Sequence, residues 1–454
     1  MTVLPGGLRV CVESVPQYGR GLAAVALTVA AGGDDDPAGR HGTAHLVEHL
    51  MFPRSGREGS AAPAGEGYAA LVAGAGGVCN AETHRDHTVF HTTVPAELLP
   101  DALAWEAGRL LGFAPTEDVI RTETDVIGEE IRGAGDAGRY WESALGALYP
   151  GSRDSFGTAA ELAGITAGEV EAFFRAHYTA PRMVLSVVGD VDPARVVAVV
   201  REVFAGVVRT AEEARAAEAP RTARETRAAE APRAAEEARV AGAVRTAEGT
   251  RAAEAPRTAT EIRTAPLPAA RPGVAVGHPL PDPVAERPAY LAQAVLAQVL
   301  GRSRLPALAR SARDGHRLTS ATVTCGYHGQ WLASAAPDLT LAVLGRAPGT
   351  EVGAAVDIWR SVLRAVADGP LPEAEHRRAV NSLLVAWHRQ ADSLPTRAVA
   401  LGRDALLLPG SAGPDALPAA LSRTTPAEVA AAARALLEGP VTVTELAPQK
   451  GTVG

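Results

Sequence analysis

Apolar positions along the chain repeat with two different periods, which predicts strands and helices in mixed order. Runs rich in valine and alanine, bounded by glycine or proline, predict strands at residues 8–13, 22–30, 78–94 with a turn at 82–86, and 184–190. Helical spacing is found over residues 68–75, 98–111 and 193–204, and in two further helices that begin near Thr116 and Ile165. Because strands and helices are interspersed throughout, the predicted fold class is α+β.

One further predicted helix contains His45-Leu-Val-Glu-His49, with Thr43 as its expected cap. On a helix the two histidines, four residues apart, lie on one face and can bind one zinc ion. Glu48 points to the same region, where a carboxylate can take a proton from water as it attacks a peptide carbonyl. The order H-x-x-E-H is the inverzincin signature. The alternative is a chance coincidence on an amphipathic helix.

Two histidines alone would bind zinc weakly, so this motif needs a third ligand. Glu123 and Glu130 are seven residues apart, or two helical turns, on a helix predicted further along the chain. They share a face of that helix, and Glu129 lies about 100° away from it. We therefore expect Glu130 to be the third ligand and Glu123 to lie behind it and orient the site. The alternative for this stretch is a solvated acidic helix face.

These motifs resemble the pitrilysin family of zinc peptidases, in order and in approximate spacing. The resemblance rests on residues 45–49, 80–88, 123–131, 156–158 and 178–192. It continues more weakly from about Gly273 to the C-terminus, so it covers nearly all of the chain except the middle. The separation between His49 and Glu130 is a few residues longer than the family pattern, and a Gly- and Ala-rich insertion at Ser55–Glu66 accounts for it.

The resemblance implies two homologous α/β halves, each a mixed, mostly antiparallel sheet with helices packed on it. It implies that His45, His49 and Glu130 bind one Zn²⁺ ion. By the same resemblance, Glu48 is the general base and Glu123 supports the ligands.

Members of this family bind peptides as an added β-strand, which holds extended substrates with modest sequence demands. The matching edge in this chain is residues 78–81, so Asn80 and Ala81 are expected to bind substrate. For Asn80 the alternative is a simple turn residue.

The second half of the sequence repeats features of the first, which indicates an internal duplication. A segment that begins at Thr425 echoes one that begins at Thr166. The second half has no H-x-x-E-H, and the rough counterparts of the two helical glutamates are Val380 and Trp387. Zinc is therefore expected only in the first half.

The middle of the chain has a different composition, in which arginine recurs every twelve residues from Arg209 to Arg257. The repeat offers almost only alanine as an apolar residue, so it cannot bury a shared core, and its prolines interrupt helices. We expect a partly helical, largely solvated linker, with partner binding as the alternative. The predicted organisation is a metal-binding domain at 1–208, the linker at 209–268 and a homologous C-terminal domain without metal at 269–454.

Composition adds limits to this interpretation. The chain has 454 residues, enough for two domains, and its net charge of -8 gives no general attraction to nucleic acids or acidic membranes. Cys11, Cys79 and Cys325 are odd in number and far apart, which favours reduced thiols over disulfides or a thiolate metal site. The N-terminal residues have neither a leader pattern nor a membrane-spanning run, so a cytoplasmic location is expected.

The leading hypothesis is a zinc-dependent endopeptidase, or a peptide-processing subunit, that hydrolyses extended peptides by metal-activated water. The competing hypothesis is a non-catalytic scaffold or partner subunit of a peptidase complex. A scaffold is expected to have lost part of the metal site, and all five residues of that site are present. The identity of the peptide substrate stays open.

A second subunit is also expected, on the basis of the family resemblance. Active members usually supply an arginine and, seven residues later, a tyrosine from their second half to hold the substrate. Anchoring the comparison on Gly315 puts Ser311 and Leu318 at these positions, and the next tyrosine, Tyr327, lies well beyond them. Three nearby arginines are out of phase, and contact of one of them with substrate is left open: Arg310, Arg313 and Arg317. We expect a related subunit to supply the pair; a homodimer or a self-sufficient monomer is the alternative.

Overall fold

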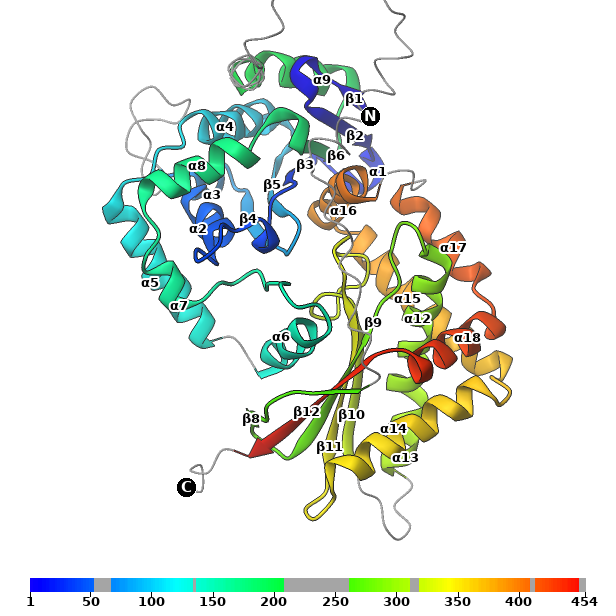
Figure 1. The fold of residues 1–454 in the computed structure, drawn as a ribbon. Coiled ribbons are helices and arrows are strands. Elements are labelled where there is room, and N and C mark those ends of the chain that lie inside the picture. The colour runs from blue at the N-terminus through cyan, green and yellow to red at the C-terminus, as the bar shows by residue number, and fades with distance from the viewer. Residues whose placement is uncertain (53–66, 134–135, 208–260, 311–317, 409–412, 449–454) are drawn as a thin grey trace, which may run out of the picture. The chain divides into compact units, whose positions relative to one another are not determined.

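The computed structural model describes residues 1–52, 67–133, 136–207, 261–310, 318–408 and 413–448. They form two compact units, each built around a six-stranded sheet (Figure 1). Unit 1 contains the described residues of 1–131, 155–252 and 391–407, and unit 2 contains those of 132–154, 253–390 and 408–454. Each unit therefore combines segments that are distant in sequence.

The sheet of unit 1 has the strand order β1-β2-β6-β3-β5-β4. Its strands are β1 (Thr2–Val3), β2 (Arg9–Ser14), β3 (Leu22–Val29), β4 (Val78–Thr83), β5 (Thr88–Pro95) and β6 (Met183–Gly189). Only β2 and β6 run parallel, and the other neighbouring strands are antiparallel. Every residue of β6 is buried, as its Val- and Leu-rich sequence requires, and β4 forms one edge of the sheet.

Helices of the N-terminal half surround the main core of unit 1. The longer ones are α2 (Thr43–Leu50), α3 (Tyr68–Gly74), α4 (Leu99–Leu111), α5 (Glu117–Gly133), α8 (Ala167–His177) and α9 (Pro193–Val203). Short helices are α1 (Pro16–Gly19) and α7 (Ala159–Leu162). Buried aliphatic and aromatic side chains such as Leu46, Leu103 and Ile127 join these helices to Leu27 of the sheet. The apolar stripes of the helices thus place α2 and α5 in one core.

A helix from the C-terminal half, α16 (Leu394–Leu407), also belongs to unit 1 and packs on β3, β5 and β6. Its Leu394 and Ala398 lie in a buried cluster with side chains of the sheet. Arg397 forms a two-pronged ion pair with Glu13, at 2.5 Å from Nη2 to Oε1 and 2.8 Å from Nε to Oε2. Apolar burial and this charged pair together hold α16 against the sheet.

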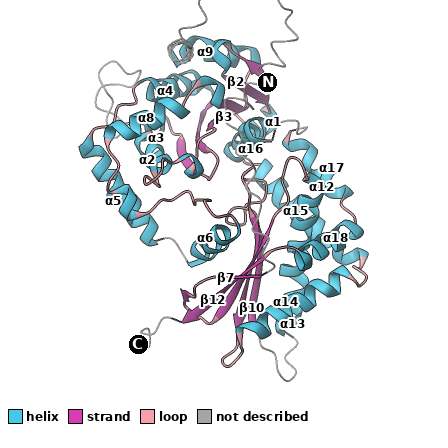
Figure 2. Cartoon of the chain, viewed as in Figure 1, coloured by secondary structure: helices cyan, strands magenta, loops and turns pink. Residues whose placement is uncertain are grey.

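The sheet of unit 2 has the order β10-β11-β9-β12-β7, and β8 also pairs with β12. Its strands are β7 (Glu261–Arg263), β8 (Leu267–Ala269), β9 (Gly273–Pro279), β10 (Leu318–Cys325), β11 (Leu339–Arg346) and β12 (Val441–Pro448). Helices of its own half are α12 (Arg287–Val299), α13 (Leu305–Arg310), α14 (Val352–Ala367), α15 (Glu373–Ala391), α17 (Leu417–Arg423) and α18 (Pro426–Glu438), drawn beside this sheet in Figure 2. From the N-terminal half, α6 (Asp136–Leu148) packs on β9 and β12, with Trp141 in a buried aromatic cluster.

The two sheets have the same topology, which confirms the prediction of two homologous halves. The path β2-β6-β3-β5-β4 in unit 1 corresponds to β7-β12-β9-β11-β10 in unit 2, and in each path only the first pair is parallel. Thr166 and Thr425 each form a capping box, with Glu169 and Glu428 respectively. The helices α6 and α16 also correspond, since each follows the long helix of its half and joins the other unit.

Some of the sequence predictions lie outside the described residues. These are the insertion at Ser55–Glu66 and most of the expected linker. At the end of that linker, within residues 209–268, the structure has β7 and the start of β8, because these residues pair with β12. The described helices are all too short or too polar to cross a membrane.

Candidate metal centre and substrate edge

The helix α2, which carries His45 and His49, begins at a glycine rather than at the expected threonine cap. Its N-cap is Gly42, in the left-handed region with φ of 104°. The carboxylate of Asp36 caps the helix from the preceding loop, accepting the N–H of Gly42 at 2.6 Å and that of Ala44 at 2.8 Å. Thr43 is the first helical residue, and its hydroxyl donates to the carbonyl of Arg40. The prediction for Thr43 was wrong because a more distant carboxylate takes the capping role.

The loop that contains Phe156 lies directly against the start of α2. A Cβ atom added to Gly157 would be 2.4 Å from the Cα atom of Gly42, so neither position leaves room for a side chain there. The close approach brings the carbonyl oxygen of Phe156 to 3.2 Å from Nδ1 of His45. Because a carbonyl only accepts hydrogen bonds, Nδ1 carries a proton, and in the neutral imidazole Nε2 of His45 keeps a lone pair that a metal ion can use.

His49 is oriented in the same way by a different partner. Its Nδ1 atom lies 3.3 Å from Oε2 of Glu123, so this ring also keeps Nε2 for another contact. Both Nε2 atoms face Glu130, whose Oε2 is 3.5 Å from Nε2 of His45 and 3.5 Å from Nε2 of His49. The structure thus brings together four of the five residues that the sequence singled out on α2 and α5.

The arrangement of these atoms fits zinc. His45, His49 and Glu130 each offer a ligand atom, and all three atoms lie within 4.8 Å of one another. Ligands about 2.1 Å from a tetrahedral zinc ion are roughly 3.4 Å apart, which is close to the two nitrogen–oxygen distances of 3.5 Å. Across the described part of the chain, this is the only group of three or more such residues with that spacing.

The electrostatics also suit a cation. Burial lowers the pKa of His45, but its hydrogen bond with Glu130 and the negative charge of Glu48 outweigh burial and raise the pKa above its usual value. The pKa of the Glu130 carboxyl is lowered, first by its hydrogen bond with His45. The negative charge of these carboxylates therefore favours a cation beside the two imidazoles.

Glu48 lies next to His49 on α2 and is partly buried. Its Oε2 atom accepts a hydrogen bond from Oγ1 of Thr83, the last residue of β4, at 2.5 Å. Tyr178 is buried nearby, and burial followed by the negative charge of Glu48 raises the pKa of its phenol. The phenol of Tyr178 is consequently neutral at physiological pH.

The expected substrate edge is the outer strand of the sheet in unit 1. Asn80 lies on β4 with its side chain exposed, and the side chain of Ala81 is buried in the main core. Within the described residues β4 pairs only with β5, and Val78 on the same strand is 67% exposed. Asn80 can contact a ligand through its side chain, whereas Ala81 can do so only through its backbone.

The counterparts of the metal site in unit 2 are apolar. Val380 is buried in the core of that unit, and Trp387 packs against the same core. Leu318, at the position expected for the tyrosine of the substrate-binding pair, begins β10 and is 6% exposed. Tyr327 is buried beside Trp141. Positions 311, 313 and 317 of that comparison lie outside the described residues.

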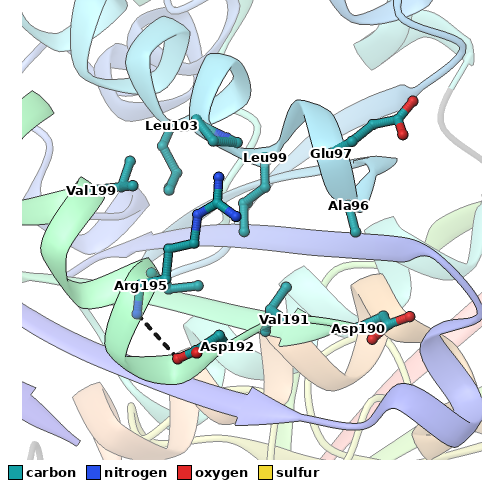
Figure 3. Close-up of a pocket in the computed structure, with 11 residues that line it drawn as sticks. Ala96, Glu97, Leu99, Leu103, Asp190, Val191, Asp192, Arg195 and Val199 are labelled. Carbon is teal, nitrogen blue, oxygen red and sulfur yellow. Dashed lines mark hydrogen bonds between the residues drawn. The ribbon is translucent and has the colours of Figure 1, made fainter.

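A separate small cavity in unit 1 has no part in this centre. It has a volume of about 130 Å³ and lies between the start of α4 and the start of α9 (Figure 3). Leu99 and Leu103 form part of its wall, and the side chain of Arg195 extends between these helices. None of the candidate metal ligands lines it.

The candidate ligands could be found from the sequence, but not everything that orients them. The carbonyl of Phe156 has no side-chain signature, and Asp36 is one of three consecutive aspartates with nothing to distinguish it. The Thr83 hydroxyl could be found only once the distance to Glu48 was known.

Comparison with known proteins gives two family models that match this chain. The model described as insulinase (peptidase family M16) matches residues 12–134, and the one described as peptidase M16 inactive domain matches residues 164–383. The first match contains the metal-binding motifs, and the second covers the end of unit 1's N-terminal segments and much of unit 2.

Curated relatives match about half of the chain. An uncharacterized zinc protease of Mycobacterium tuberculosis is 34% identical over 208 residues, which cover 45% of this chain and 46% of the relative. A protein named probable mitochondrial-processing peptidase subunit beta, from Arabidopsis thaliana, is 31% identical over 211 residues. These cover 45% of this chain and 38% of the relative. The chain thus matches less than half the length of each relative.

Solved structures share the fold over nearly the full length. A protease from Helicobacter pylori has a TM-score of 0.75 at 18% identity and covers 98% of both chains. A peptidase M16 inactive domain from Pseudomonas fluorescens has a TM-score of 0.70 at 17% identity, covering 99% of this chain and 98% of the other.

Proposed function

The chain belongs to the insulinase (M16) family of peptidases, and from this premise we propose that it is a zinc-dependent endopeptidase or the metal-bearing subunit of a peptide-processing enzyme. One observation carries the proposal: both histidines of the H-x-x-E-H motif direct Nε2 toward one oxygen of Glu130. Each ring has its own partner on Nδ1, and both partners keep Nε2 available. Two histidines with only a structural role would not need this arrangement.

His45, His49 and Glu130 would hold the zinc ion. When bound, zinc supplies a Lewis acid that acidifies water and polarises a peptide carbonyl. Glu48 lies on the same helix beside His49, where its carboxylate can accept a proton from the attacking water and return it to the leaving amine. Phe156 and Glu123 fix the ring orientation of the two histidines and keep both in the tautomer that binds metal.

The peptide would bind along β4 as an additional strand. An edge strand offers unpaired backbone groups, and backbone pairing selects an extended conformation more than a particular sequence. Thr83, at the end of β4, contacts Glu48, so this edge ends at the catalytic group. The exposed side chains of Val78 and Asn80 would contribute what sequence preference there is.

The replacement of Glu48 by glutamine tests the assignment of the base. Glu48→Gln leaves the three ligands intact, so zinc should be retained while peptide hydrolysis falls at least about 100-fold. Zinc content by mass spectrometry and turnover of a peptide library, with any required partner present, give the two measurements. Near-normal turnover by this variant would remove Glu48 from the mechanism.

A matched pair of substitutions tests the third ligand. Glu130→Gln should lose zinc, whereas Glu129→Gln, one residue earlier and off the ligand face, should keep both zinc and activity. A non-catalytic scaffold remains the competing function. It is less well supported, since nothing in a scaffold requires Glu48 and the complete ligand set to persist together.

We propose further that the active form contains a second, related subunit. Leu318 is aliphatic and buried, so it cannot donate a hydrogen bond to a substrate carbonyl. A donor of that kind would stabilise the charge that develops during hydrolysis. One relative is named as a subunit of a processing peptidase, which also supports an assembly of unlike chains. The peptide that such an assembly cleaves is not specified by these residues.

A further inference from the structure

We propose that Thr83 is a positioning residue that fixes the carboxylate of Glu48 for its role as general base. This inference rests on the proposed peptidase function. Glu48 belongs to α2 and Thr83 to β4, so the contact joins two elements that are separated by 35 positions in the sequence. The distance from Oγ1 of Thr83 to Oε2 of Glu48 is 2.5 Å, at the short end for a hydroxyl that donates to a carboxylate.

The direction of this hydrogen bond follows from the chemistry of the two groups. An ionised carboxylate can only accept hydrogen bonds, so the hydroxyl of Thr83 donates to it. The bond occupies one oxygen of Glu48 and leaves the other available to a water molecule. A glutamate side chain has three rotatable bonds, and the contact removes much of the rotation that would carry the carboxylate away from the metal site.

The position of Thr83 makes it a rigid donor. Thr83 pairs with Thr88 at the closed end of the β4–β5 hairpin, so the adjoining strand restrains its backbone. Threonine is branched at Cβ, which limits the rotation of its side chain about the first torsion. The edge that receives a peptide in the proposed function and the base that acts on it are therefore linked through one hydroxyl.

Two other threonines of this hairpin, Thr88 and Thr93, help to distinguish a positioning role of Thr83 from a structural one. The hydroxyl of Thr88 donates to the backbone carbonyl of Ala31, which is an ordinary structural contact. Thr93 lies at the other end of the hairpin, opposite Val78, and its buried hydroxyl has no hydrogen-bond partner among the described residues. Thr93 therefore offers a control in which the same chemical change removes no contact.

The kinetic test uses Thr83→Val, Thr83→Ser and the control Thr93→Val in the zinc-loaded chain, with any required partner. Thr83→Val should lower kcat at least about tenfold, change KM less than about twofold and leave the zinc content unchanged. Thr83→Ser keeps the hydroxyl and should restore kcat to within about threefold of the wild type, and Thr93→Val should not change kcat. Wild-type kcat in Thr83→Val, or an equal loss in Thr83→Ser, would overturn the proposal.

A second measurement needs neither metal nor activity. In the metal-free chain, Thr83→Val should lower the melting temperature by roughly 2–4 °C when Glu48 is present and by less than about 1 °C in combination with Glu48→Ala. Equal losses in the two backgrounds would show that Thr83 does not act through Glu48. A wild-type chain that hydrolyses no peptide would overturn the proposed function and the catalytic role of Thr83 with it. An active wild type beside a fully active Thr83→Val would overturn the role of Thr83 alone.

Discussion

At the scale of single residues, function depends on which nitrogen of a histidine carries the proton. Phe156 and Glu123 leave Nε2 of His45 and of His49 available at the candidate metal centre. The same principle operates in unit 2, where Nε2 of His278 accepts a hydrogen bond from Nε1 of Trp359 at 2.9 Å. His278 must therefore be neutral in the folded chain, and burial, followed by the charge of Arg360, lowers its pKa to about 3.

The lowered pKa of His278 predicts a loss of stability in acid. The unfolded chain takes up a proton below about pH 6.5, and the folded chain resists it until about pH 3. The contribution of His278 to the free energy of unfolding is therefore complete above pH 6.5. It falls as the pH drops toward 3, and at pH 4 the loss is roughly 3 kcal/mol. We expect His278→Gln, whose amide oxygen can still accept a hydrogen bond, to show a weaker fall in melting temperature between pH 7 and pH 4.

The control for this prediction is His388→Gln, the same substitution at an exposed position on α15. It should keep the pH dependence of the wild type. An unchanged slope in His278→Gln would mean that His278 does not set the acid sensitivity of unit 2.

The residues of the candidate metal centre could be predicted because helical geometry relates them. Spacings of four and seven residues place His45 with His49 and Glu123 with Glu130 before any coordinates are known. The orienting carbonyl of Phe156 could not be predicted, since every residue has a carbonyl and only the close approach of two glycines brings this one to His45.

At the scale of elements, the helices α6 and α16 decide how the sheets are covered. Each follows the long helix of its own half but belongs to the other unit. Gly402 on α16 lies against β3 and β6, and a Cβ atom added there would be 2.6 Å from Oγ1 of Thr28 and 2.9 Å from Oγ of Ser186. Ser186 also donates a hydrogen bond to the carbonyl of Ala398 at 2.6 Å. Helix and sheet are therefore as close as a residue without a side chain allows.

The close packing of Gly402 predicts the effect of a single methyl group. Gly402→Ala should destabilise unit 1 by about 1–3 kcal/mol, because the helix or the strand must move to accept it. The matched control is Gly146→Ala on the corresponding helix α6, where an added Cβ meets nothing within 4 Å. That substitution should stabilise by up to about 1 kcal/mol through helix propensity. Urea unfolding measures both, and an equally stable Gly402→Ala would contradict the packing of α16.

Most strands and helices could be predicted from periodicity, and the start of α5 at Thr116 agrees with a hydrogen bond from the N–H of Val119 to Oγ1 of Thr116. The exchange of α6 and α16 could not be predicted. An amphipathic pattern shows that one face of a helix must be buried, but it does not show which sheet covers that face.

At the scale of the whole molecule, the described part of the duplicated fold has one candidate metal centre. In unit 2 the sequence comparison matches the two glutamates of α5 to Val380 and Trp387, which pack in a core where unit 1 has candidate ligands. The sequence predicted this asymmetry, because the loss of the carboxylates is visible without coordinates. The predicted boundaries of the domains and the linker remain predictions.

The proposed second subunit leads to a test of assembly. The purified chain alone should hydrolyse peptides at least about tenfold more slowly than the chain co-expressed with a related protein from a neighbouring gene, since a stabilising donor is missing. Light scattering on the same samples gives the mass of the active species. Full activity from a monomer would contradict the requirement for a partner, and full activity from a homodimer would replace the related subunit by a second copy.

The measurement that tests the central claim most directly is a zinc titration of the metal-free chain, with its partner if one is required, followed by peptide hydrolysis. With one group of ligands in the described residues, activity should rise in proportion to added zinc, level off at one ion per chain and stay absent in His49→Ala. Hydrolysis that persists after zinc is removed, or that His49→Ala retains in full, would contradict the account.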